Sequence, residues 1–137
     1  MIGSWSDYSD AFLVLVGFGA FALLGIPLLV RPLVWAAVLR WSSAADDDIT
    51  VYFGRSLGAV VCVVSVFAIV AARDASVQPF FFQITAATFA LTAAVHVWGA
   101  VRRIQPRTET AETLVWIGLF VVTLLCYPGS TSVAATR

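Results

Sequence analysis

The sequence predicts an all-α integral membrane protein: a bundle of four transmembrane helices, with a short cytoplasmic interfacial helix between helices one and two. Three observations favour this fold. Of the 137 residues, 61% are hydrophobic and only 12% are charged, whereas a soluble domain carries about a quarter charged residues. Four apolar runs each approach the roughly 20 residues that cross a hydrocarbon core. Each run is apolar all round, unlike the one-sided stripe of a soluble helix.

The four apolar runs define the expected spans. They cover about residues 11–30, 50–72, 79–101 and 110–128. Backbone polar groups in hydrocarbon must bond within their own segment or in a closed barrel. Because the runs lack the alternating pattern of barrel strands, we expect helices. Residues 1–137 show no internal repeat or low-complexity tract, so we expect a single domain.

The stretch 32–43, "PLVWAAVLRWSS", is too long for a tight loop between the first two spans. In a helical arrangement its apolar residues, Trp35 and Trp41 among them, share one side, and Arg40 lies opposite. Pro32 suits the first turn of such a helix. We expect a short helix in the membrane interface; the alternative is a first span that continues past a proline bend.

Arginine placement predicts the orientation. The connections between spans one and two and between spans three and four hold Arg31, Arg40, Arg102, Arg103 and Arg107, whereas the other side holds Arg73 and Arg137. Short loops rich in Lys and Arg face the cytoplasm. The sequence therefore predicts an inner-membrane protein whose N-terminus and C-terminus are both outside.

Polar chemistry is concentrated between Val95 and Glu112, which includes the only histidine, His96, and both glutamates, Glu109 and Glu112. A rise of about 1.5 Å per residue puts Arg55 of span two at a similar depth. A charge inside a membrane is costly without a partner. We therefore expect Arg55 to pair with Glu112 or, failing that, with Glu109.

Three interpretations of this polar layer remain open. The ion pair is a structural clasp between spans two and four, or Arg55 extends outward alone. In the third interpretation, the layer binds an anionic headgroup or another polar ligand through Arg55, His96, Glu112, Glu109 and Arg103.

A polar stripe in the third span leads to His96. Thr85, Thr88 and Thr92 follow helical spacing and share one face with it. Threonines in transmembrane helices commonly bond to backbone or to neighbouring helices, so we favour close packing. The alternative is a path for protons or a small solute.

Two glycines, Gly54 and Gly58, are spaced four apart in the second span, which permits close backbone approach. They serve either packing within the chain or homo-oligomerisation. Cys62 and Cys126 have neither metal-ligand spacing nor a CxxC pattern and are expected to be apolar packing residues.

No residue is assigned a catalytic role. A single histidine cannot complete a two-histidine haem site or a zinc site, and two glutamates are too few for a di-iron site. We therefore expect no metal and no cofactor.

The function favoured by the sequence is that of a small non-catalytic membrane protein: an accessory subunit, or a lipid- or small-molecule-binding module of a membrane assembly. The alternative is a small oligomeric transporter or channel that uses the threonine stripe and the Arg55/His96/Glu112 layer. An enzyme is the least favoured class. Membrane lipids are the expected partners, with other membrane subunits or a second copy besides. The net charge of zero argues against nucleic acid.

Overall fold

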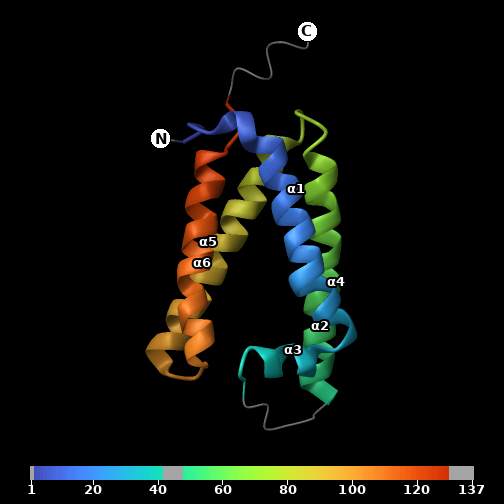
Figure 1. Cartoon of the computed structure of the whole chain (residues 1–137), viewed down its shortest axis with the longest axis vertical. Helices are drawn as coiled ribbons and strands as arrows, with labels where there is room; N and C mark the ends of the chain where they lie inside the picture. The colour runs from blue at the N-terminus through green and yellow to red at the C-terminus, as the bar shows by residue number, and fades with distance from the viewer. Residues whose placement is uncertain (1, 42–47, 130–137) are drawn as a thin grey trace.

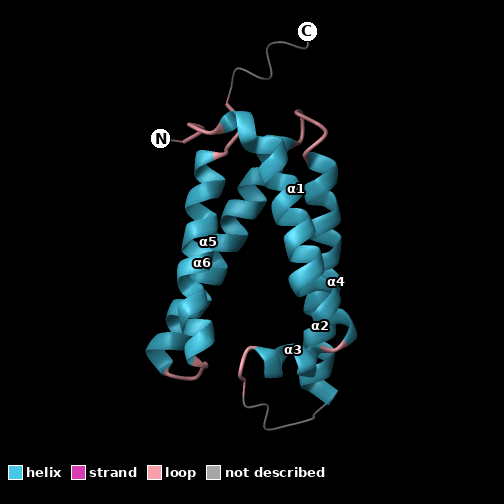
Figure 2. Cartoon of the chain, viewed as in Figure 1, coloured by secondary structure: helices cyan, strands magenta, loops and turns pink. Residues whose placement is uncertain are grey.

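The computed structural model describes residues 2–41 and 48–129, and this part of the chain consists of helices joined by turns and loops, without strands (Figure 2). Four helices in it are long and apolar enough to cross a membrane. They span Ser6–Val30, Asp48–Ala71, Gln78–Arg102 and Arg107–Leu125. The prediction of an all-α protein with four apolar spans is confirmed, and its boundaries agree to within about five residues.

The first span consists of several helical segments. A short 3-10 turn η1 (Ser6–Tyr8) leads into α1 (Ser9–Ala20), a π-helical turn η2 (Phe21–Gly25) follows, and α2 (Ile26–Val30) ends the span. Such π turns insert one extra residue into an α-helix and rotate the residues that follow it. The other three long helices are α4 (Asp48–Ala71), α5 (Gln78–Arg102) and α6 (Arg107–Leu125).

The long helices associate as two hairpins. In one hairpin α1 and α2 pack along α4, and in the other α5 packs along α6. The hairpins meet at the end that carries the N-terminal segment and diverge toward the opposite end, like the two legs of a letter A (Figure 1). Direct contacts between α4 and α5 are few.

The hairpins are joined by an apolar core at the apex of this A. The rings of Phe12 and Phe82 lie 5.6 Å apart between centroids, and Phe82 meets Tyr127 edge-on at 5.9 Å. Leu13 and Phe82 are fully buried. The buried members of this core are Phe12, Leu13, Ala71, Ala72, Phe82, Phe89 and Cys126.

Hydrogen bonds reinforce the apex. The backbone N–H of Gly3 donates to the carbonyl of Leu124 at 3.0 Å, and the Ser9 hydroxyl donates to the carbonyl of Cys126 at 2.7 Å. Carbonyls at the end of a helix lack partners within that helix, so the N-terminal segment satisfies the end of α6. The beginning of the first span and the end of the last therefore lie at the same end of the molecule.

Glycines bring α4 against the first span. A Cβ added at Gly58 would lie 2.4 Å from the backbone nitrogen of Leu29 and 2.9 Å from the carbonyl oxygen of Gly25. A Cβ added at Gly54 would lie 2.5 Å from Cβ of Pro32. Both glycines therefore face neighbouring segments of the same chain, and neither leaves room for a larger residue without movement.

The segment after α2 forms a separate short helix, α3 (Pro32–Val38). Arg31 has φ −141° and ψ 66°, outside the helical region, so the first span ends before it. A first span that continues past the prolines is thereby wrong. Figure 1 shows α3 extending from the first hairpin into the gap between the two hairpins. Residues 42 and 43 of the predicted interfacial helix lie outside the described part of the chain.

The α3 segment also contacts the second hairpin. The Thr108 hydroxyl donates to the carbonyl of Leu39 at 2.5 Å, and the indole Nε1 of Trp41 donates to Oε1 of Glu109 at 2.9 Å. The connection between the first two spans and the connection between the last two therefore lie at the same end of the molecule, as four successive spans require.

Candidate functional site

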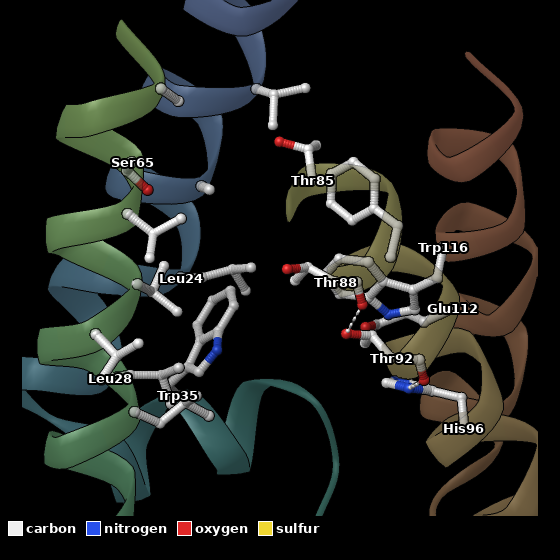
Figure 3. Close-up of a pocket in the computed structure, with 18 of the residues that line it drawn as sticks. Leu24, Leu28, Trp35, Ser65, Thr85, Thr88, Thr92, His96, Glu112 and Trp116 are labelled. Atoms are coloured by element: carbon white, nitrogen blue, oxygen red, sulfur yellow. Dashed lines mark hydrogen bonds between the residues drawn. The ribbon is translucent and has the colours of Figure 1, made fainter. Parts of the chain in front are cut away.

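A cavity of about 660 Å³ lies between the diverging hairpins (Figure 3). Ligand sites in proteins commonly occupy about 300–1,000 Å³ and are mostly apolar with a few polar groups. The first span, α3 and α4 line one side, and α5 and α6 line the other. Its apolar wall includes Leu24, Leu28, Val61, Val64, Phe81 and Phe89.

Several large apolar side chains that line this cavity are only partly covered by protein. Leu57 is 55% exposed, Val60 is 59% exposed and Val64 is 40% exposed, although all three line the cavity. Each exposed apolar Å² costs about 25 cal/mol in water. The wall therefore favours an apolar occupant over water.

The threonine stripe of α5 forms part of the opposite wall. Thr85, Thr88 and Thr92 all line the cavity, and Figure 3 shows them along its α5 side. Each hydroxyl donates to the carbonyl four residues earlier, at 2.9, 2.8 and 2.8 Å. Because their protons are used within the helix, these hydroxyls offer only acceptor lone pairs to an occupant.

Three ionisable residues converge where the stripe ends. His96 comes from α5, whereas Glu109 and Glu112 lie three apart on the first turns of α6 and so share a face. One potential ligand atom from each lies within 4.8 Å of the other two. All three residues line the cavity, so the apolar chamber has one polar end.

The ring of His96 has a defined tautomer. Its Nδ1 lies 2.9 Å from the carbonyl oxygen of Thr92. A carbonyl only accepts, so Nδ1 carries a proton, and neutral His96 presents a lone pair at Nε2. Nε2 lies 3.1 Å from Oε2 of Glu109, yet it is buried and no hydrogen bond of acceptable geometry reaches it.

Glu109 has a second partner from the other hairpin. Its Oε1 accepts the bond from Trp41, so one carboxylate links α5 and the segment after α3. Glu109 is only 8% exposed. No sequence pattern connects Trp41 to this layer; the available signal is a tryptophan in a predicted interfacial helix.

Arg55 does not join the polar end, and the predicted ion pair with Glu112 or Glu109 is wrong. Its side chain is exposed, and neither glutamate lies within ion-pair distance of it. At about 100° per residue, Arg55 is about 200° around α4 from Leu57, which lines the cavity. It therefore faces away from both glutamates.

Arg103 also lies outside the cluster. It is exposed and ends α5 in the left-handed conformation, with φ 55° and ψ 34°. Its backbone N–H bonds to the carbonyl of Ala100 at 3.1 Å, which closes the helix end. The structure thus brings together His96, Glu109 and Glu112 of the five predicted ligand-binding residues, and neither arginine.

Comparison with known proteins gives no relative. No protein-family model matches the chain, and neither a curated protein nor a solved structure matches it.

Proposed function

We propose that this chain is a non-catalytic membrane protein that binds a lipid between its two hairpins, as a module of a membrane assembly. The observation that carries this proposal is the cavity itself: an apolar chamber with its polar groups gathered at one end. A lipid has the same division between hydrocarbon and a polar headgroup. The hydrocarbon would lie along Leu57, Val60 and Val64, with the headgroup near Glu112.

The proposed membrane placement follows from the four apolar spans. The bundle crosses the cell inner membrane, and its polar end lies at the cytoplasmic side. Five arginines support this orientation, since they belong to the two connections that share an end with the His96 cluster. In this placement α3 lies in the cytoplasmic interface, where Trp35 and Trp41 suit the boundary between headgroups and hydrocarbon.

The test compares two valines of α4 that are adjacent in sequence. Val64 lines the cavity, whereas Val63 is 56% exposed and does not. Val64→Trp should fill the chamber and lower the amount of phospholipid that co-purifies with the protein, measured by native mass spectrometry. Val63→Trp adds the same bulk to the outer face and should retain lipid as the parent does. Equal retention in both variants would contradict lipid binding in the cavity.

A small transporter is the second candidate, and the threonine stripe favours it. Thr85, Thr88 and Thr92 form a row of acceptor oxygens along the cavity toward His96. Cysteines at these three positions, in a background without Cys62 and Cys126, should react with a membrane-impermeant thiol reagent if the row lines a wet path. Lack of reaction at all three, with a reactive exposed-loop cysteine as positive control, would remove this candidate.

A further inference from the structure

The geometry points to a divalent transition-metal site, of the kind zinc occupies, formed by Nε2 of His96 and the carboxylates of Glu109 and Glu112. Nε2 of His96 is buried without a hydrogen-bond partner, and it lies beside the carboxylates of Glu109 and Glu112. With Nδ1 of His96 protonated toward Thr92, the neutral ring turns a lone pair toward two carboxylates. Lone pairs at this distance repel each other unless a positive charge lies between them.

The charges in the cluster favour a doubly positive ion. When both carboxyl groups are ionised they carry two negative charges, and a neutral His96 carries none. A proton on the ring would leave the cluster at minus one at the end of an apolar cavity, whereas one divalent ion would bring it to zero. No arginine in the described part of the chain is within ion-pair distance of either glutamate.

The spacing also suits a metal. Zinc binds histidine nitrogen and carboxylate oxygen at about 2.0–2.2 Å, which sets neighbouring ligand atoms about 3–3.5 Å apart. Nε2 of His96 and Oε2 of Glu109 already have this spacing, at 3.1 Å. Glu112 completes the set within 4.8 Å, a separation that rotation of its side chain can close. Imidazole with carboxylates suits zinc better than magnesium or calcium, which prefer oxygen alone.

Outer contacts hold two of the ligands in place. The Nδ1 bond to the carbonyl of Thr92 fixes both the tautomer and the orientation of His96. The indole of Trp41 does the same for Glu109. Metal-binding histidines almost always donate their second nitrogen in this way, and ligating carboxylates are themselves hydrogen-bonded. Three protein ligands leave one tetrahedral position for water or a ligand of the cavity.

The experiment uses the full chain in detergent, stripped with a chelator and then equilibrated with Zn²⁺. Bound zinc is counted by elemental mass spectrometry and affinity is measured by calorimetry. The parent should bind one Zn²⁺ per chain. Glu112→Gln and His96→Gln should each bind less than a tenth as much at the same free zinc. Glu112→Gln is the decisive variant, because none of the hydrogen bonds described above involves Glu112, and its fold is checked by circular dichroism.

The matched control is Asp74→Asn, which removes an exposed carboxylate from the α4–α5 turn at the opposite end of the molecule. It should bind zinc as the parent does. Absence of zinc from the parent, equal zinc in all four proteins, or a loss confined to His96→Gln would each overturn the proposal. The proposed metal site does not depend on lipid binding. Protein that retains lipid but binds no zinc would overturn only the metal site. Protein that binds zinc but retains no lipid would overturn only the proposed lipid binding.

Discussion

Nε2 of His96 lies 3.1 Å from Oε2 of Glu109, and this contact joins α5 to the beginning of α6 at the polar end of the cavity. Glu109 simultaneously accepts a hydrogen bond from Trp41, so the same carboxylate links the two hairpins where they are farthest from their shared core. Removing one partner of such a buried charged group destabilises the protein strongly, because the remaining charge has lost its hydration and has no other charged partner.

The first prediction concerns the coupling between these two residues. In zinc-equilibrated protein, where a cation lies between Nε2 of His96 and Oε2 of Glu109, His96→Ala and Glu109→Gln should each lower the free energy of unfolding. The double variant should lose less than the sum, with a coupling of about 0.5–3 kcal/mol, as found for residues in contact. Reversible unfolding in mixed micelles gives the free energy of unfolding of the parent, the two single variants and the double variant, which together form a double-mutant cycle.

The control cycle pairs Arg55→Ala with Glu112→Gln. Because Arg55 lies on the face of α4 that is turned away from the cavity, their coupling should stay below about 0.5 kcal/mol, the usual additivity limit for separated sites. A large coupling there, or none between His96 and Glu109, would contradict the described arrangement of the polar end.

The second prediction tests the contact between α4 and the first span. Gly58→Ala places a methyl group 2.4 Å from the backbone nitrogen of Leu29, so backbone must move. Overpacking of this kind costs about 1–3 kcal/mol, and a matching loss in unfolding free energy is expected. Gly118→Ala in α6 is the matched control, since nothing lies within 4 Å of its added Cβ. Alanine there should be neutral or stabilising by up to about 1 kcal/mol.

If Gly58→Ala leaves stability unchanged and instead alters the oligomeric state, the glycine pair serves association between chains. That result would contradict the intramolecular packing of Gly58 against Leu29.

The third prediction concerns orientation. Ala75 lies in the exposed α4–α5 turn and Ile104 in the exposed α5–α6 turn, at opposite ends of the molecule. In a background without Cys62 and Cys126, Ala75→Cys should label from outside intact cells with an impermeant maleimide. Ile104→Cys should label only after the cells are opened. The reversed pattern would invert the proposed topology.

The sequence predicts the four spans and the break between the first span and α3 well, because both depend on residues that are close together in the chain. Length and all-round hydrophobicity are sufficient to find the four long helices. Pro32 marks the start of α3, since a proline suits the first turn of a helix and interrupts the one before it. The depth of His96, Glu109 and Glu112 also follows from counting residues along helices.

The direction in which each side chain points around its helix does not follow from counting residues along the chain. The rise per residue puts Arg55 at the level of the glutamates, but the glycine face of α4 determines which side of the helix turns toward the cavity. Gly54 and Gly58 fix that face against Pro32 and Leu29. Helical phase, at about 100° per residue, puts Arg55 on the side of α4 opposite Leu57, and this decides its direction only once Leu57 is known to line the cavity.

The association of α3 with the second hairpin depends on tertiary structure alone. Trp41 and Glu109 are 68 residues apart in the chain, and no local pattern links an indole in one connection to a carboxylate in another. The cluster of His96, Glu109 and Glu112 could not be predicted from the sequence for a related reason. A single histidine does not complete a multi-histidine site, and only the packing of α5 against α6 brings two carboxylates close to it.

A high-resolution structure of the protein in a lipid nanodisc tests the central claim most directly. We expect two diverging hairpins with continuous elongated density between Val64 and Thr88, ending in a polar group near Glu112. Helices α4 and α5 packed against each other along their length, with Val64 in contact with Thr88 and no space between them, would contradict it.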